Sequence, residues 1–246
     1  RFITMTSETF VVTGGAQGIG AGIVARLVAD GHRVAIIDII DPDPSVLAES
    51  GGRVSFIHAD LSVASEARRA AREALAELGH VYSLVHCAAY IPLVSFAELT
   101  DDHWEKSFAV NVTSAFALTQ ELTPSMRERK SGRVVLFASS TMFAPAPNMS
   151  HYVATKGAVI GFARALAHEL GPDFITVNAI APGLTATAGS VTTIPQQHFD
   201  LVASRQAIPR TGQIDDQVAA VSYLVSPEAG FMTGQTLLVD GGESHI

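Results

Sequence analysis

The sequence has little of what a secreted, membrane-spanning or nucleic-acid-binding protein needs. Its one cysteine, Cys87, cannot form a disulfide within the chain. No uninterrupted apolar run reaches the roughly 18 residues of a membrane-spanning helix, and no segment has the basic start and apolar centre of a signal peptide. Lysine and arginine number 16 against 24 acidic residues, and a net charge of -8 argues against binding to nucleic-acid phosphates. We therefore expect a cytoplasmic protein with neither a nucleic-acid nor a membrane partner.

Metal-ligand spacing is also missing. The nine histidines include no His-x-x-x-His pair, so we expect no metal site. Cys87 has no basic neighbour in the sequence and is interpreted as a small buried strand residue rather than a nucleophile. No linker, repeat or charge block marks a boundary, which predicts one domain over residues 1–246. Because the chain begins at Arg1, we expect residues 1–4 to precede a native start at Met5.

Short apolar runs alternate with stretches of helical period along the whole chain, as in repeated strand–helix–strand units. Most of the runs are apolar throughout, which is typical of parallel strands covered on both faces. The chain is therefore predicted to be an α/β protein with a seven-stranded, doubly wound parallel sheet and helices on both faces. Strands are expected at residues 9–13, 33–38, 54–59, 82–87, 133–139, 175–180 and 236–239. Helices are expected at residues 19–30, 65–78, 101–129, 150–170 and 215–224.

The expected helix at 150–170 has little polar face, because apolar side chains occur at most of its positions. A monomer would expose part of this surface to water. We therefore expect a second subunit to cover it, which makes the protein a homo-oligomer.

A glycine-rich segment from Thr13 to Gly20 follows the first strand and opens the first helix. Glycines at 14, 18 and 20 would permit a tight turn, a close approach of phosphate to backbone N–H groups and close packing of the helix on the strand. An ordinary glycine-rich turn is the alternative. The strand before the segment and the helix after it favour a loop that binds the pyrophosphate of a dinucleotide.

Asp38 ends the second strand, 18 positions beyond Gly20. A carboxylate there can accept hydrogen bonds from the adenosine ribose hydroxyls and would repel the 2'-phosphate of NADP. Neither Gln17 nor Ile39 supplies a cation for such a phosphate. Asp38 could instead be a turn residue before the loop that follows, but together with the glycine segment it favours NAD as the cofactor.

Tyr152 and Lys156 are four residues apart in an expected helix, so their side chains share one face. A nearby ammonium favours the phenolate form of a tyrosine, which would bring the phenol into the range of a working base. Such a pair alone is common on solvated helices. We interpret this pair as part of a reaction centre because the sequence also contains the glycine segment, Asp38, Ser139 and Asn111.

With these features the chain resembles the short-chain dehydrogenase/reductase family over almost its whole length. The matching pieces, in order, are the glycine segment at 13–20, Asp60-Leu61, Asn111, Ser139, Tyr152 with Lys156, Asn178, Pro182-Gly183 and residues 239–242. The resemblance implies a single-domain Rossmann fold, most often in a homotetramer. Within the family the chain is similar to bacterial secondary-alcohol dehydrogenases of the 1-phenylethanol type and to pyridoxal 4-dehydrogenase.

The resemblance implies hydride transfer between a substrate carbinol carbon and nicotinamide C4, with Tyr152 exchanging the hydroxyl proton. Ser139 would hold the substrate oxygen, Lys156 would bind the nicotinamide ribose and Asn111 would support a proton path. Ser140, beside Ser139, is interpreted as support. The residues implied to contact the cofactor are Gly14, Gln17, Gly18, Ile19, Gly20, Asp38, Asp60, Leu61, Ala88, Ala89, Tyr152, Lys156, Pro182, Gly183, Thr185 and Thr187.

One segment departs from the family pattern. Where the family usually shows Asn-Asn-Ala-Gly after the fourth strand, this chain has His86-Cys87-Ala88-Ala89. Side-chain contacts there are therefore not expected to follow the family.

The expected substrate is a small alcohol or ketone that is uncharged and carries a ring, because the candidate pocket is mostly apolar. The substrate residues are Ser139, Tyr90, Leu93, Thr141, Met142, Phe143 and Met149, and the segment near 190–204 is expected to form a mobile lid. Two alternatives stay open: a ketoacyl-type reductase, which Asp38 disfavours, and a catalytically inactive nucleotide-sensing protein.

Overall fold

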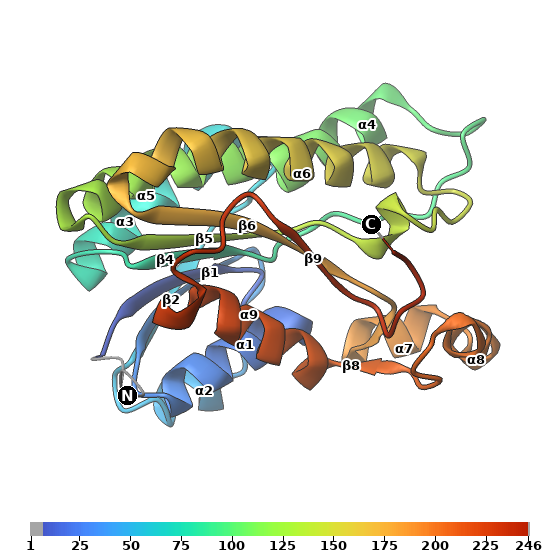
Figure 1. Cartoon of the computed structure of the whole chain (residues 1–246), viewed down its shortest axis with the longest axis horizontal. Coiled ribbons are helices and arrows are strands. Elements are labelled where there is room, and N and C mark those ends of the chain that lie inside the picture. Colours follow the sequence, from blue (N-terminus) through green and yellow to red (C-terminus); the bar gives the residue numbers. More distant parts are fainter. Residues whose placement is uncertain (1–6, 246) are drawn as a thin grey trace.

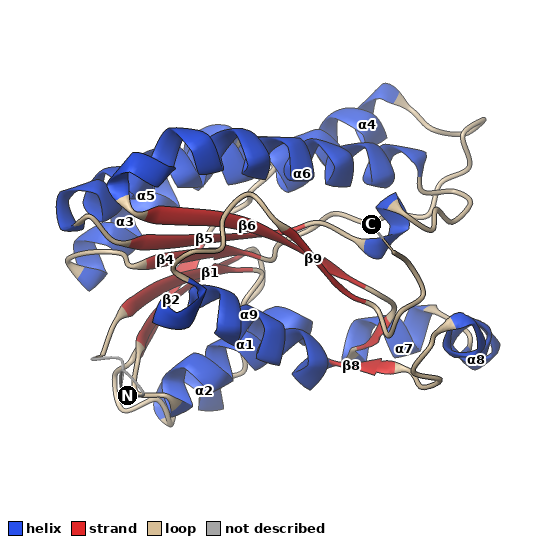
Figure 2. Ribbon diagram, viewed as in Figure 1, coloured by secondary structure: helices blue, strands red, loops and turns tan. Residues whose placement is uncertain are grey.

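The structure, a computed structural model, describes residues 7–245, so the expected start at Met5 lies outside it. Seven parallel strands form one sheet in the order β3-β2-β1-β4-β5-β6-β9, which confirms the predicted fold class (Figure 2). The order reverses direction beside β1, between the two halves of the sheet. The strands are β1 (Thr9–Thr13), β2 (Arg33–Asp38), β3 (Val54–His58), β4 (Ser83–His86), β5 (Gly132–Phe137), β6 (Ile175–Pro182) and β9 (Thr236–Val239).

Helices cover both faces of this sheet (Figure 1). One layer contains α1 (Gly18–Ala29) and α9 (Ile214–Val225), with the short α2 (Pro44–Ala48) beside β3. The other layer contains α3 (Ala64–Leu78), α4 (Asp101–Phe108), α5 (Ser114–Arg129) and α6 (Ser150–Leu170). Single 3-10 turns occur at Ser140–Met142, Gly171–Asp173 and Pro227–Ala229. No helix within residues 7–245 is long and apolar enough to cross a lipid bilayer.

The sheet has a separate apolar core on each face, because successive strand residues point to opposite sides. Val11, Leu84 and Leu136 belong to the core under α3, α5 and α6, whereas Phe10 and Val135 belong to the core over α1 and α9. All five side chains are almost fully buried. The strands therefore need apolar residues at every position, which is why the uniform apolar runs predicted them correctly.

The stretch expected to form one helix at 101–129 is interrupted by a π-helical turn at Ala109–Thr113. The Ser114 hydroxyl donates a hydrogen bond to the Val110 carbonyl within this turn. A π-helical turn adds one residue to the helix and is frequent at functional sites. The insertion lies at Asn111, the only asparagine between residues 101 and 129.

The segment after β6 contains structure that the sequence did not predict. It forms α7 (Ala188–Thr193), α8 (Gln196–Arg205) and a two-stranded sheet of β7 (Thr185–Ala186) and β8 (Gly212–Gln213). These elements lie beyond the carboxyl end of the main sheet (Figure 1). Thr187 caps α7 by accepting a hydrogen bond from Ser190 N at 3.0 Å. The expected lid at 190–204 is thus largely helical.

Candidate active site

The loop between β1 and α1 has the close packing that the glycine pattern predicts. Gly14 and Gly18 adopt positive φ angles of 67° and 58°, which only glycine accepts without strain. A Cβ atom at Gly14 would lie 2.8 Å from the Ala88 nitrogen, and one at Gly20 would collide with the Gly14 carbonyl oxygen. A side chain at either position would therefore displace the loop.

The amino end of α1 is open toward this loop. Gln17 occupies the N-cap position without a side-chain cap, and the first turn contains no acidic residue. The first N–H groups of the helix consequently lack a side-chain acceptor, and the helix dipole adds positive potential there. A pyrophosphate supplies both the acceptors and the negative charge, so these residues fit a dinucleotide.

Asp38 lies beside the same loop and is only 9% exposed. One carboxylate oxygen accepts a hydrogen bond from Ala16 N at 3.0 Å, and the other accepts from Ile39 N at 2.7 Å. Asp38 thus stabilises the turn, as expected if it is a turn residue. Its carboxylate oxygens still have lone pairs that can accept hydrogen bonds from further donors. None of the ion pairs among residues 7–245 involves Asp38, so its negative charge is not neutralised by a basic side chain.

The residues expected at the adenine side also meet near the carboxyl edge of the sheet. Asp60 accepts a hydrogen bond from Ser62 N at 2.8 Å, and the Ser62 side chain, with this backbone bond, holds the pKa of its carboxyl below the usual range. Leu61 is buried, and Ala89 is exposed. Ala88 N donates to the Thr13 hydroxyl at 3.2 Å, which holds the segment after β4 against the glycine loop.

His86 explains how the departure from the family pattern is accommodated. Burial lowers the pKa of its imidazole from 6.5 to about 3, so the ring is neutral. Its Nε2 lies 3.2 Å from the Ser114 hydroxyl, which itself donates to Val110 O, so Nε2 carries the proton. Its Nδ1 lies 2.9 Å from the Thr13 hydroxyl and accepts from it. His86 therefore connects the end of β1 with the π-helical turn, and every polar atom in this network has a partner.

We expect His86→Asn to change how stability depends on pH. In the unfolded wild-type chain the His86 imidazole is protonated below its ordinary pKa of 6.5, whereas in the folded protein it stays neutral down to about pH 3. The free energy of unfolding therefore decreases as the pH falls from 6.5 to about 3. The asparagine variant lacks this group. Its stability deficit relative to the wild type should shrink by about 1 to 2 kcal/mol between pH 7 and pH 5. Urea unfolding at both pH values measures this; a constant deficit would contradict a buried neutral His86.

Tyr152 and Lys156 lie on the inner face of α6, only 7% and 2% exposed. The Lys156 ammonium lies 5.3 Å from the centre of the Tyr152 ring and donates a hydrogen bond to the Phe137 carbonyl at 2.6 Å. Phe137 ends β5, so the lysine is held at the carboxyl edge of the sheet. The two side chains therefore share one buried site, as their spacing predicted.

The electrostatics of this pair differ from the simplest expectation. Burial raises the pKa of the Tyr152 phenol to about 12, and the hydrogen bond with Ser139 opposes that shift. Burial also lowers the pKa of Lys156 to about 8. Lys156 points to a backbone carbonyl rather than to the phenol oxygen, so the lysine alone does not make this phenol acidic. Additional positive charge at the site is needed for Tyr152 to act as a base near neutral pH.

Ser139 follows β5 and caps the 3-10 turn Ser140–Met142. Its hydroxyl oxygen accepts hydrogen bonds from Thr141 N at 3.2 Å and from the Thr141 hydroxyl at 2.9 Å. Ser140 is buried in the turn itself. Ser139, rather than Ser140, is the serine whose hydroxyl lowers the pKa of the Tyr152 phenol.

Asn111 is fully buried and joins three segments. Its side-chain oxygen accepts from Tyr90 N at 2.8 Å, and its amide donates to Tyr90 O at 3.1 Å and to the Thr155 hydroxyl at 3.0 Å. Thr155 in turn donates to the Tyr152 carbonyl at 2.7 Å. Asn111 thus ties the segment after β4 to the turn of α6 that carries Tyr152, and Thr155 is a supporting residue that the sequence interpretation missed.

The segment after β6 crosses to the glycine loop. Gly183 packs against Asp240, since a Cβ atom there would lie 2.8 Å from the Asp240 Cα. The Thr185 hydroxyl donates to Gly183 O at 3.0 Å. The Thr187 side chain would lie 3.7 Å from a Cβ at Gly18, so the segment expected at the nicotinamide side lies beside the glycine loop. Pro182, Gly183, Thr185 and Thr187 remain predicted cofactor contacts.

The predicted substrate residues occupy different environments. Met142 and Phe143 pack against the buried core, whereas Leu93 is 66% exposed. The Tyr90 ring lies under the Lys106 ammonium, which is 4.9 Å from the ring centre. Met149 occupies the N-cap of α6 and is half-buried. An open groove beside them, which the sequence did not predict, is lined by Phe96, Pro145, Ala146, Pro147, Asn148, Ser150, Val153 and Ala154.

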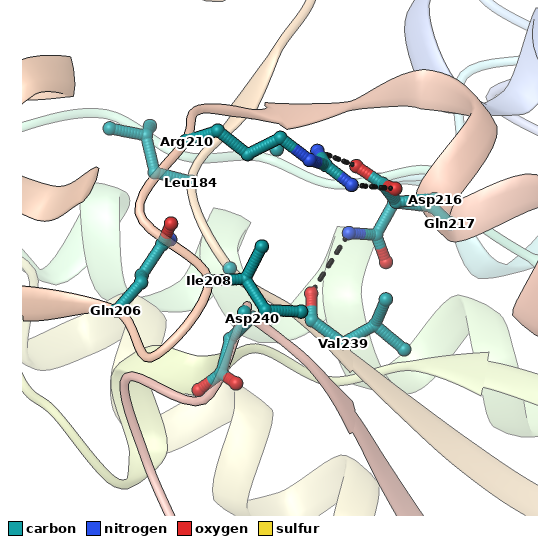
Figure 3. A pocket seen from close by; sticks show the side chains of 11 residues that line it. Leu184, Gln206, Ile208, Arg210, Asp216, Gln217, Val239 and Asp240 are labelled. Carbon is teal, nitrogen blue, oxygen red and sulfur yellow. Dashed lines mark hydrogen bonds and ion pairs between the residues drawn. The ribbon is translucent and has the colours of Figure 1, made fainter.

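A separate cavity of about 130 Å³ lies between the end of β9 and the segment that follows α8 (Figure 3). Arg210 and Asp216 pair across it through two contacts of 2.6 and 2.7 Å. The side-chain oxygens of Gln206 and Gln217 are buried without a hydrogen-bond partner among residues 7–245. Neither Tyr152 nor Ser139 lines this cavity, so it is not the reaction centre. Ordered water would satisfy the two amide oxygens.

Cys87 lies close enough to Tyr152 and Lys156 to influence their pKa values, but it is not activated as a nucleophile. The low polarity around it raises the pKa of the Cys87 thiol to about 12, which makes it a poor nucleophile, as expected. The sequence predicts a buried strand residue, but Cys87 follows the end of β4 and is only partly buried against the core. Among residues 7–245, no group of three or more histidine, cysteine, aspartate or glutamate side chains is placed to hold a metal ion.

Comparisons with known proteins agree with this geometry. A family profile described as enoyl-(acyl carrier protein) reductase matches residues 14–244. The chain is 34% identical to a probable galactose dehydrogenase of Rhizobium meliloti, with 98% of this chain and 97% of that protein covered. It is 35% identical to nodulation protein G of a Rhizobium species, over 98% and 99% of the two chains. A solved short-chain dehydrogenase/reductase from Serratia marcescens superposes with a TM-score of 0.91 at 32% identity, covering 99% of this chain and 100% of that one.

Proposed function

Because the chain belongs to the short-chain dehydrogenase/reductase family, and is therefore an oxidoreductase that uses a nicotinamide dinucleotide, we propose that it interconverts a secondary alcohol and a ketone with NAD. The observation that carries the proposal is the buried group formed by Tyr152, Lys156, Ser139 and Asn111. This group lies at the carboxyl edge of the sheet, where the glycine loop also opens. Edges of this kind, near a reversal of strand order, are where parallel sheets bind ligands.

The bound nicotinamide would supply hydride exchange at its C4 atom and, when oxidised, a positive charge near the phenol. Tyr152 takes the hydroxyl proton during alcohol oxidation and returns it during ketone reduction. Ser139 donates a hydrogen bond to the reacting oxygen and so fixes its position. Lys156 holds the nicotinamide ribose, and Asn111 keeps the catalytic turn of α6 in register with the segment after β4.

NAD is the proposed cofactor because of Asp38. Its buried carboxylate lies beside the glycine loop with no basic partner, where it suits ribose hydroxyls and repels a 2'-phosphate. The other predicted contacts are divided between the loop at Gly14 to Gly20, the adenine side at Asp60, Leu61, Ala88 and Ala89, and the nicotinamide side at Pro182 to Thr187.

An uncharged, ring-bearing substrate is proposed from the apolar side chains around the site. Met142, Phe143 and Met149 lie near Ser139 and Tyr152 in the chain and present no charge. The class is also the one expected from the resemblance, itself a prediction from the sequence, to secondary-alcohol dehydrogenases of the 1-phenylethanol type and to pyridoxal 4-dehydrogenase. The name of the Rhizobium meliloti relative adds a sugar as a substrate to be tested.

The two alternative functions, a ketoacyl-type reductase and a catalytically inactive nucleotide-sensing protein, have less support. The family profile's description concerns an acyl-carrier-protein reductase, a class related to the ketoacyl-type alternative. Asp38 disfavours the NADP that ketoacyl-type reductases usually prefer. A nucleotide sensor without turnover would have no need of the buried Ser139–Tyr152 contact.

A homotetramer is also proposed, with α6 in an interface. Several apolar side chains of this helix are only half-buried: Val153, Ala154, Ala158, Phe162 and Leu166. A second subunit would remove this surface from water.

The function is tested by a substrate screen that follows the absorbance of the reduced nicotinamide. We expect 1-phenylethanol and related secondary alcohols to be oxidised with NAD, and pyridoxal, galactose and a ketoacyl thioester to react more slowly. Preferential reduction of the thioester with NADPH would contradict the proposal. Tight cofactor binding with no turnover on any of these compounds would favour the nucleotide sensor.

A further inference from the structure

We propose that Thr141 is a positioning residue that directs the Ser139 hydroxyl proton toward the reacting oxygen. This inference rests on the proposed function, because it assigns a donor role to Ser139. It begins from the two hydrogen bonds that converge on one atom, Ser139 Oγ. Thr141 supplies both of them, one from its backbone nitrogen and one from its hydroxyl.

The hydrogen-bond capacity of a serine hydroxyl makes this arrangement directional. A hydroxyl has one donor and two acceptor positions. Thr141 N occupies one acceptor position of Ser139 Oγ at 3.2 Å, and the Thr141 hydroxyl occupies the other at 2.9 Å. With both acceptor positions filled, Ser139 can take part in a further hydrogen bond only as the donor.

The backbone fixes this geometry before any ligand binds. Ser139 caps the 3-10 turn Ser140–Met142, and Met142 N donates to Ser139 O at 3.2 Å. Thr141 is therefore held over Ser139 by main-chain contacts on both sides. Ser139 is 7% exposed, so water has little access to compete for its oxygen.

The remaining donor position of Ser139 is left available to Tyr152 or to a substrate oxygen. The hydrogen bond between Ser139 and Tyr152 lowers the pKa of the phenol against the effect of burial, as expected when the serine donates to the phenol oxygen. The other titratable groups at this phenol are Cys87, whose charged form would raise its pKa, and Lys156, which points to Phe137 O. Ser139 is thus the neighbour that stabilises negative charge here, whether on Tyr152 or on a substrate oxygen.

Thr141→Val tests the inference because valine has the same shape but no hydroxyl, and Thr141→Ser restores the hydroxyl. In Thr141→Val the Ser139 proton can rotate away from the reaction centre. We expect kcat for alcohol oxidation at neutral pH to fall about 10-fold, and the alkaline midpoint of its pH profile to rise by about one pH unit. Thr141→Ser should recover both values. In a Ser139→Ala background, Thr141→Val should have no further effect on kcat.

A second readout does not require turnover. Tyrosines labelled with carbon-13 at Cζ report ionisation by NMR, and the Tyr152 signal is identified by its loss in Tyr152→Phe. Thr141→Val should raise the pH at which this signal begins to move, and Thr141→Ser should not. If no substrate is turned over, the proposed function fails while the NMR result still decides the role of Thr141.

Three results would overturn the role of Thr141. These are an unchanged pH dependence in Thr141→Val by both readouts, an equal loss in Thr141→Ser, or an additive loss in the Ser139→Ala background. Should Thr141→Val fail to fold, Thr141→Ala replaces it with the same expected direction.

Discussion

Tyr152→Phe is expected to lower kcat by about 10²- to 10⁴-fold in both directions, the range that a positioned general acid–base contributes. The substitution removes only the hydroxyl that we propose to exchange the substrate proton. The ring keeps its packing on the inner face of α6, where the side chain is 7% exposed. Because the glycine loop and Asp38 are untouched, the affinity for NAD should change little. Steady-state kinetics and a fluorescence titration with NADH separate the two effects.

Tyr82→Phe is the matched control for this substitution. Tyr82 is also buried, and its hydroxyl donates to Val225 O at 3.2 Å, away from Ser139 and Lys156. Its loss should lower stability by about 1 kcal/mol and leave kcat unchanged. A Tyr152→Phe enzyme that retains wild-type kcat would refute the acid–base role, and an equal loss of kcat in Tyr82→Phe would point to general destabilisation.

Asp38→Asn is expected to reduce the preference for NAD over NADP by about 10²-fold, because the like charges of a carboxylate and a 2'-phosphate oppose each other by several kcal/mol. Asparagine keeps one side-chain oxygen to accept from Ala16 N or Ile39 N, so the turn beside the glycine loop should survive. The loss of charge should weaken the binding of NAD, because the hydrogen bonds from the ribose hydroxyls lose a charged acceptor. It should strengthen the binding of NADP, because the repulsion of the 2'-phosphate is removed. The ratio of kcat/KM for the two cofactors measures the change.

Asp43→Asn removes the same charge from a nearby exposed position. Asp43 accepts from Ser45 N at 2.9 Å at the start of α2 and is not in contact with the glycine loop. The ratio of kcat/KM for NAD and NADP in this variant should match that of the wild type. Equal use of NAD and NADP by the wild type, or equal changes in the two variants, would contradict the assignment to Asp38.

Features that depend on local pattern were predictable from the sequence. The apolar runs identified all seven strands of the main sheet, because each is covered on both faces. The glycine segment identified a loop in which Gly14 and Gly18 do adopt positive φ. The spacing of Tyr152 and Lys156 placed both on one buried face of α6, because residues four apart in a helix share a face.

Features that depend on contacts between distant segments were not predictable. The π-helical turn at Ala109–Thr113 depends on the partners of Asn111 in the segment after β4 and in α6. The role of His86 becomes visible only when the end of β1 lies beside it. Helix α7 is too short for a periodic signal to exceed chance. The pKa of Tyr152 is controlled by burial, which a spacing argument does not contain.

The most direct test is a crystal structure of the protein with NADH and an unreactive analogue of the ketone. The distances from the bound carbonyl oxygen to the Tyr152 and Ser139 hydroxyl oxygens should both fall within about 2.6 to 3.2 Å. The nicotinamide should lie on the opposite side of the carbonyl carbon. A carbonyl bound out of reach of Tyr152, or a nicotinamide held away from this edge of the sheet, would contradict the proposed chemistry.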